Sequence, residues 1–183
     1  MEWHYSSFAS VSAQRITEIC VANRITGSIL PKICVLSLSH SPMEFRVVLG
    51  DWATQQFAAR LVRDEVFIHE QKISVEDEWD DMDAVCVHAI VYGPDDEVLG
   101  TGRLLPDGHI GRMAVRKAAR GAGVGAAILK ELKAEAKLRG HKDVVLSAQM
   151  QVEPFYARCG FVREGDEYMD VGMPHIQMRC KLV

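Results

Sequence analysis

Residues 112–132 constrain the fold more than any other part of the chain. They read RMAVRKAARGAGVGAAILKEL, in which an apolar, strand-like run is followed by glycines and then by apolar residues spaced as on one face of a helix. Glycines at the start of a helix leave unpaired backbone N–H groups accessible at the positive end of the helix dipole, where they bind an anion such as a phosphate. The segment therefore predicts a strand, an anion-binding loop and a helix in succession.

The hydrophobic periodicity predicts alternating groups of strands and helices. A strand at residues 45–49 precedes a helix with Phe57, Leu61 and Val62 on one face. Three apolar runs separated by turns then predict a meander of three strands: AVCVHAIVYG, EVLGTGRLLP and HIGRMAV. The helix of the glycine-rich segment ends near Gly140 and is followed by a strand at DVVLSA, a brief helix at VEPFYARCGF and a final strand at HIQMRCKLV. The order β-α-β-β-β-α-β-α-β predicts a mixed sheet with helices packed on it.

Composition and charge exclude several classes of protein. The chain has 183 residues, 48% of them hydrophobic and 25% charged, which is typical of one soluble globular domain. Its net charge of -4 gives no general attraction to nucleic acid or to an anionic membrane, and no apolar run is long enough to span a bilayer. The five cysteines form no C-x-x-C pair, which argues against a disulfide framework and a thiolate zinc site and favours the reducing cytoplasm.

The first part of the chain differs in composition from the rest. Residues 1–42 are rich in serine and poor in acids, and their SILPKICVLSLSH run is interrupted by proline and lysine. Met43 opens the first convincing strand pattern. We therefore expect residues 1–42 to be a poorly packed or extraneous N-terminal extension and residues 43–183 to form the working domain.

Three kinds of phosphate-binding loop are alternatives for the glycine-rich segment. A Walker A loop requires Gly-Lys-Ser/Thr, but Ala126 and Ala127 stand where the lysine and the hydroxyl residue should be. The dinucleotide pattern G-x-G-x-x-G/A is satisfied by Gly121, Gly123 and Ala126, but residues 116–120 separate it from the strand that it should follow directly. The third kind of loop uses the basic residues that the second leaves unexplained.

The strand ending in Met113-Ala114-Val115 and the RGAGVG that follows resemble the acyl-CoA site of the GNAT superfamily of N-acyltransferases. In that family the loop amides bind the pyrophosphate and the strand backbone pairs with the pantetheine arm. The resemblance implies an α+β fold with three layers, α/β/α, and a mixed, mostly antiparallel central sheet flanked by helices. It also implies acetyl-CoA as the co-substrate, no metal, and a cofactor site made of Met113, Ala114, Val115, Arg120, Gly121, Ala122, Gly123, Val124 and Gly125.

The segment QVEPFYARCGF is similar to the FY-x-x-x-GF ending of the same family, in which the tyrosine hydroxyl lies near the CoA sulfur. By this resemblance Tyr156 is the general acid for the leaving thiolate, and an ordinary tyrosine pKa of about 10 keeps its proton in place at neutral pH. Phe155 and Phe161 are expected to be core aromatic residues. Cys159 is not expected to be a nucleophile, because the sequence places no histidine near it.

A narrower similarity is to the ElaA-like branch of the family, which includes the YjcF-like proteins. The motifs that carry it are RDEVFIHEQKISVEDEWDDMD, HAIVYG, GTGRLLP, IGRMAV and MPHIQM, and the similarity covers nearly all of residues 44–180. It implies that the acceptor side is lined or supported by Arg63, Phe67, Glu70, Gln71, Asp80, Asp83, His88, Arg103, Arg112 and His175. Among these, Glu70, His88 and His175 are candidates for the base that takes the proton of the attacking amine, with a water molecule as an alternative.

An acidic run connects the first helix with the meander. Residues 76–83 hold six acids in eight positions. Such a run is most often a solvated loop, but if it faces the cleft its field favours a cationic amine.

Together these features predict an acetyl-CoA-dependent N-acetyltransferase that acts on a primary amine of a small molecule or peptide by direct attack. The alternative from another class is a non-catalytic CoA-binding or interaction module with the same fold, and a dinucleotide oxidoreductase is a third interpretation. We expect no nucleic-acid or membrane partner. A homodimer through an edge strand is compatible with such a sheet, but the sequence does not decide the oligomeric state.

Overall fold

The computed structural model describes residues 43–182, so the expectation for residues 1–42 lies outside the described residues. The elements are, in chain order, β1 (Arg46–Gly50), α1 (Trp52–Arg63), the π-helix η1 (Asp64–Glu70), α2 (Val75–Glu78), the 3₁₀ helix η2 (Asp81–Val85), β2 (Val87–Tyr92), β3 (Val98–Leu104), β4 (Ile110–Val115), η3 (Lys117–Ala119), α3 (Val124–Leu138), β5 (Asp143–Gln149), η4 (Met150–Val152), α4 (Glu153–Arg158), β6 (Val162–Asp170) and β7 (Met173–Lys181). None of the helices in this described part of the chain has the length and apolar content needed to cross a membrane.

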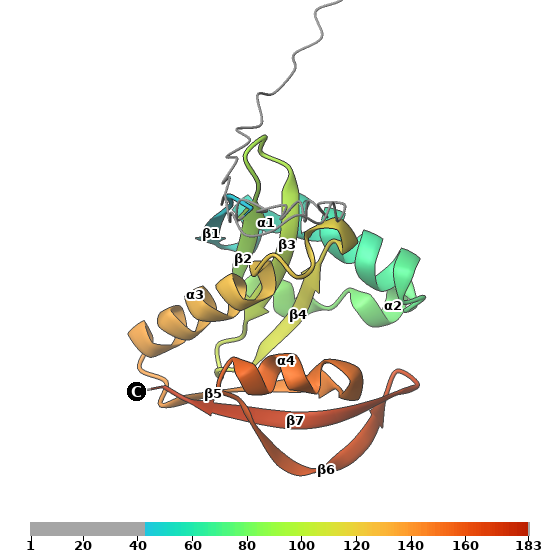
Figure 1. Cartoon of the computed structure of the whole chain (residues 1–183), viewed down its shortest axis with the longest axis vertical. Helices are drawn as coiled ribbons and strands as arrows, with labels where there is room; N and C mark the ends of the chain where they lie inside the picture. The colour runs from blue at the N-terminus through green and yellow to red at the C-terminus, as the bar shows by residue number, and fades with distance from the viewer. Residues whose placement is uncertain (1–42, 183) are drawn as a thin grey trace, which may run out of the picture. The chain divides into compact units, whose positions relative to one another are not determined.

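The strands form two antiparallel sheets where the sequence predicted a single mixed sheet (Figure 1). The four-stranded sheet has the order β1-β2-β3-β4, and the three-stranded sheet has the order β5-β7-β6. A parallel bridge between His109 and Val145 connects the chain just before β4 with β5. The predicted α+β class, with mostly antiparallel strands flanked by helices, is confirmed.

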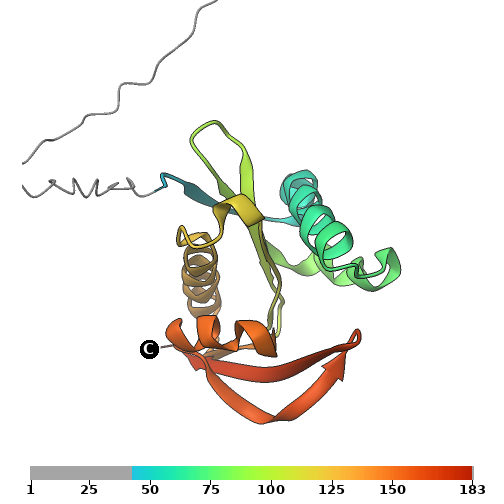
Figure 2. The ribbon, with the colours of Figure 1, turned by 45° about the vertical axis from the view of Figure 1, so that its right-hand side comes forward.

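Helices α1 and α3 lie on opposite sides of the four-stranded sheet (Figure 2). Successive side chains of a strand point to opposite faces, so β2 contributes to both layers. Ala89 and Val91 share a core cluster with the α3 residue Ile128, whereas Ile90 shares one with the α1 residue Val62. Because both faces are covered, β2 and β3 read as continuous apolar runs in the sequence.

The buried face of α1 differs from the predicted one. Phe57 is 81% exposed and Leu61 is 43% exposed, so that Val62 is the one buried residue of the predicted three. The helix instead faces the core with Ala58 and Ala59 as well as Val62. Alanine side chains let a helix approach a sheet closely, but they give a weaker periodic signal than the larger apolar residues on the exposed side.

Strand β6 is absent from the predicted order. All nine of its residues are exposed, so it has no alternation of apolar and polar residues that could identify a half-buried strand. It nonetheless pairs with β7 antiparallel, from Val162 opposite Arg179 to Asp170 opposite Met173. An exposed edge strand of this kind has no periodic signature in the sequence.

A β-bulge interrupts the pairing of β4 with β3. Arg112 and Met113 of β4 together face the single β3 residue Gly102. Arg112 has a φ of 48°, in the left-handed region that residues other than glycine seldom adopt. A Cβ atom on Gly102 would lie 2.5 Å from the Met113 sulfur and 2.8 Å from the Ile128 Cγ2, so any other residue here would displace these side chains. Because a bulge bends its strand, it changes the direction of β4 near the point where the two sheets separate.

Candidate active site

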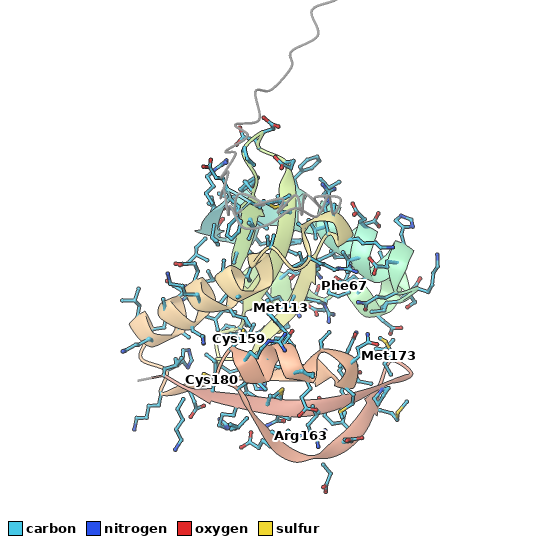
Figure 3. The ribbon with its side chains drawn as sticks, viewed as in Figure 1. Phe67, Met113, Cys159, Arg163, Met173 and Cys180 are labelled. Atoms are coloured by element: carbon cyan, nitrogen blue, oxygen red, sulfur yellow. The ribbon has the colours of Figure 1, made fainter. Side chains whose placement is uncertain are left out.

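A cavity of about 780 Å³ lies where the two sheets separate. Its walls come from η1, β4, the glycine-rich loop before α3, β5, α4 and the β6–β7 hairpin. Figure 3 labels one residue on each of three walls: Phe67 on η1, Met113 on β4 and Met173 on the hairpin. Segments far apart in the sequence therefore meet around one space.

The glycine-rich loop forms one end of this cavity. Gly121 and Gly123 have φ angles of 82° and 90°, and no atom lies within 4 Å of where their Cβ atoms would be. The backbone conformation therefore requires these glycines, and close packing does not. Gly123 is the N-cap of the 15-residue helix α3 and supplies no side chain to cap it, so the first N–H groups of the helix have no capping side chain. Gly123, Val124 and Gly125 line the cavity, whereas Ala122 does not.

The backbone of β4 forms the adjoining wall. Met113, Ala114 and Val115 all line the cavity, and β4 is the last strand of its sheet. The outer edge of such a strand has backbone N–H and C=O groups without a strand partner. This edge and the loop together fit an extended ligand that ends in a diphosphate, because the edge offers backbone pairing and the helix start attracts the anion.

Tyr156 is a buried phenol on the same cavity. Its side chain is 8% exposed, and burial raises its pKa to about 12. Phe155 also lines the cavity, while Phe161 is a core residue that contacts the Tyr156 ring edge to face. Burial raises the pKa of the Cys159 thiol, so this cysteine is protonated at neutral pH and is a poor nucleophile.

Glu70 and Gln71 approach the cavity from the end of η1. The Glu70 carboxylate accepts from both terminal nitrogens of Arg120 at 2.7 Å, and these hydrogen bonds lower the pKa of Glu70. Gln149, on β5, donates to the Gln71 side-chain oxygen at 3.1 Å. Through these hydrogen bonds the end of η1 is connected to Arg120 beside the glycine-rich loop and to β5 of the three-stranded sheet.

His175 begins the buried part of β7 and also lines the cavity. Its Nδ1 lies 2.9 Å from the Met173 carbonyl oxygen. Because a carbonyl oxygen only accepts, Nδ1 carries the hydrogen and Nε2 has the free lone pair in the neutral imidazole. The ring stacks against Tyr168, whose hydroxyl is hydrogen-bonded to Ser147.

A buried ion-pair cluster holds the acidic run against the four-stranded sheet. Arg63 donates to Glu78 and, at 2.8 Å, to both carboxylate oxygens of Asp83. Arg103 donates to Asp80 and Asp83 at 2.7 Å. Arg63, Glu78 and Asp83 are at most 3% exposed. Burial raises the pKa of Glu78, a shift that Arg63 opposes. Charges buried this deeply persist because each has a partner of opposite sign.

Several residues expected to line or support the acceptor side lie in this cluster and not on the cavity wall. Arg63, Asp80, Asp83 and Arg103 are outside the cavity lining, and their charges are paired with one another. His88 is also outside it: its Nε2 lies 2.9 Å from the Asp83 carbonyl oxygen, and burial lowers the pKa of its ring. The acidic run is therefore not a fully solvated loop. Its buried carboxylates are paired with arginines and do not present unpaired negative charge to the cleft.

Arg112 connects this cluster with the cavity. It donates to the backbone oxygens of Asp77 and Glu78 at 3.1 Å and to the Asp80 carboxylate at 3.0 Å. Its side chain is 28% exposed, and it lines the cavity. Arg112 therefore lies on the cavity wall, while its guanidinium donates to residues 77–80 of the acidic run.

Several residues on the cavity wall have no counterpart in the sequence analysis. Gln149, Ser147 and Asp170 line it from β5 and β6. The alternation of β5 gives the signal that could have identified Ser147 and Gln149, since they share the face opposite Leu146 and Ala148. Asp170 had no such signal because β6 itself was not predicted. Within residues 43–182, no group of three or more His, Cys, Asp or Glu side chains is arranged to hold a metal ion.

Comparison with known proteins decides the family. A family model described as acetyltransferase (GNAT) domain matches residues 48–182, which is most of the chain. The chain belongs to the GNAT acetyltransferase family. The family predicted from the glycine-rich loop is therefore confirmed, and with it the membership of this chain among the acyl-CoA N-acyltransferases.

Individual relatives confirm the predicted branch of the GNAT family. The Bacillus subtilis (strain 168) protein named uncharacterized N-acetyltransferase YjcF is 40% identical over 121 residues, which are 64% of this chain and 86% of that protein. The crystal structure of Escherichia coli ElaA is similar with a TM-score of 0.66 and 28% identity, covering 75% of this chain and 100% of that one. An acyl-CoA N-acyltransferase from Pseudomonas aeruginosa has a TM-score of 0.66 and 32% identity, covering 75% and 99%.

Proposed function

We propose that this GNAT protein transfers an acetyl group from acetyl-CoA to a primary amine of a small molecule or peptide. The observation that carries the proposal is a single cavity with the glycine-rich loop at one end and Glu70, Gln71 and His175 on another wall. A cofactor and an acceptor that enter from these two sides meet beside Tyr156.

The cofactor half of the proposal rests on the loop and the edge of β4. We assign the diphosphate to the backbone amides of residues 121–125 and to Arg120, because a helix start and a guanidinium both favour phosphate oxygens. We assign the pantetheine arm to the outer backbone edge of Met113, Ala114 and Val115. Ala122 contributes its backbone to the turn, since its side chain is outside the cavity lining.

The reaction needs one bond to form and one to break. The neutral amine nitrogen attacks the thioester carbonyl carbon, the C–N bond forms and the C–S bond breaks, and the electron pair leaves with the sulfur. Tyr156 gives its phenol proton to that sulfur, and its raised pKa ensures that it is protonated beforehand. The proton lost by the amine passes to a base and returns to Tyr156 through solvent, so that the enzyme is regenerated.

Two residues are suited to take the proton of the amine. The His175 Nε2 has a free lone pair on the cavity wall, and the Glu70 carboxylate belongs to a residue that lines the same cavity. His88 is not proposed, because it is buried outside the cavity. Gln71 and Arg112 are the predicted acceptor-binding residues that remain in the proposal, with Asp80 acting through Arg112.

The experiment is release of free thiol from acetyl-CoA with a panel of amines, comparing the wild type with Tyr156→Phe. We expect turnover with at least one amine class and a fall in kcat of about 10²- to 10⁴-fold in the variant, which is the range for loss of a general acid. A protein that binds CoA tightly but releases no thiol with any amine would be the CoA-binding module instead. We place the reaction in the cytoplasm, because the cysteine pattern favours a reducing compartment.

A further inference from the structure

Three of the five N–H groups of the Arg120 guanidinium donate to protein groups, although the residue belongs to the proposed diphosphate site. Its Nε donates to the Val115 carbonyl oxygen at 3.0 Å, and its two terminal nitrogens donate to the two oxygens of Glu70 at 2.7 Å. This fork is the geometry with which a guanidinium binds either a carboxylate or a phosphate. Both side chains are 41% exposed, so a ligand can reach the pair.

The pair joins two parts of the cavity that have different proposed roles. Glu70 ends η1, whose wide helical turn closes with the Gln71 N–H donating to the Val66 carbonyl oxygen at 3.0 Å. Arg120 stands directly before the first glycine of the loop. Arg116, four residues earlier, lies 2.9 Å from Glu65 on the same π-helix. Two acids of η1 thus pair with two arginines of the loop segment.

We propose that Glu70 and the diphosphate of the acyl-CoA compete for the guanidinium of Arg120, so that cofactor binding frees the Glu70 carboxylate toward the acceptor. The inference rests on the proposed function. A diphosphate held at residues 121–125 lies next to Arg120 and presents a more highly charged partner than one carboxylate. The exchange costs little, because an ion pair as exposed as this one contributes little to stability.

This competition has a consequence for the order of binding. Before the cofactor binds, the Glu70 charge is paired and is not available to an amine. After the exchange, the same carboxylate is unpaired beside Gln71, where it attracts an ammonium group or accepts a proton from it. The complete acceptor site therefore forms after the cofactor has bound.

The test is the affinity for CoA of four proteins, measured by titration calorimetry: wild type, Glu70→Gln, Arg120→Gln and the double variant. We expect Glu70→Gln to bind CoA about twofold to fivefold more tightly, since Arg120 no longer has to leave a carboxylate. We expect Arg120→Gln to bind more weakly. In the Arg120→Gln background, removing Glu70 should leave the affinity unchanged, because there is no longer a guanidinium to compete for.

Glu65→Gln is the matched control, because it removes the same charge from the same π-helix but from the partner of Arg116. It should increase the affinity less than Glu70→Gln does. An equal gain from Glu65→Gln, or a Glu70→Gln gain that persists without Arg120, would reveal a general field effect and overturn the competition. Unchanged or weaker binding by Glu70→Gln would also overturn it. If the wild type itself did not bind CoA, that result would contradict the proposed function, and with it the competition that rests on it.

Discussion

Arg112 combines a strained backbone with a side chain that makes three hydrogen bonds. Its φ of 48° lies in the left-handed region, which costs a residue with a Cβ about 1–2 kcal/mol. Its donors reach Asp77, Glu78 and Asp80, and these bonds hold the acidic segment against β4. We infer that the side chain offsets the strain of the bulge and positions the cavity wall.

Two substitutions separate the backbone of Arg112 from its side chain. Arg112→Ala should lower the free energy of unfolding by about 2 kcal/mol, because charge-assisted hydrogen bonds are lost. Arg112→Gly should be about 1 kcal/mol more stable than Arg112→Ala, since glycine relieves the strain. Both variants should have a lower kcat, because neither has a side chain that holds the acidic run against β4. Urea unfolding and kcat measure the two effects, and full activity in Arg112→Gly would contradict the anchoring role.

Tyr156 predicts a dependence of stability on alkaline pH. Burial raises its pKa to about 12, whereas an unfolded tyrosine has a pKa of about 10. Between these two pKa values the native state keeps a phenol proton that the unfolded state loses. The contribution of Tyr156 to the free energy of unfolding is therefore complete below pH ~10 and falls as the pH rises above it.

Tyr156→Phe removes this dependence. From pH ~9 to pH ~11 the wild type should lose about 1 kcal/mol more of its free energy of unfolding than the variant does. The buried Cys86 thiol, whose pKa burial raises to about 11, is present in both proteins and cancels in the comparison. Urea unfolding at the two pH values measures the difference, and equal losses would mean that the phenol is not buried.

Among the elements, the acidic run is held in place mainly by its buried ion pairs with Arg63 and Arg103. Asp83 is 3% exposed and bound by two arginines, whereas the Asp80 side chain is 33% exposed. Asp83→Asn should lower the free energy of unfolding by about 3 kcal/mol, because it leaves buried guanidinium charge without its partner. Asp80→Asn should cost about 1 kcal/mol. Urea unfolding compares them, and amine preference should be unchanged in Asp83→Asn. A smaller effect at position 83 than at 80 would contradict this account.

The two faces of helix α1 should tolerate substitution to different degrees. Phe57→Ala should change the free energy of unfolding by no more than about 0.5 kcal/mol, because the side chain is 81% exposed. Ala59→Leu should lower it by about 1–3 kcal/mol, because it adds volume to a site with no exposed surface. Thermal or urea unfolding of both variants tests which face is buried, and a large loss at Phe57 would restore the face predicted from the sequence.

Elements with a local signal in the sequence were predictable, and elements that depend on tertiary packing were not. The strand, loop and helix around Gly121 and Gly123 were predictable, because the glycines mark a local backbone requirement. Strands β2 to β4 were predictable from apolar runs. The partners of Arg63 were not, because they lie 15 and 20 residues away and their meeting depends on tertiary packing. The exposed strand β6 and the alanine face of α1 lacked the large, periodic apolar residues on which the prediction depended.

In the molecule as described, the site arises because the strands form two separate sheets. The four-stranded sheet contributes the edge of β4, the three-stranded sheet contributes β5 and the β6–β7 hairpin, and the cavity lies between them. Helix α3 directs its uncapped start at one end of this space. Family membership follows from residues 48–182, while the chemistry depends on whether the loop holds the cofactor.

The most direct measurement is therefore a titration of the isotope-labelled protein with CoA, followed by the backbone amide NMR signals of the glycine-rich loop. We expect saturable shifts at Gly121, Gly123, Val124 and Gly125, whereas the signal of the exposed Gly140 at the far end of α3 should not move. Loop signals that remain in place at saturating CoA would contradict the account.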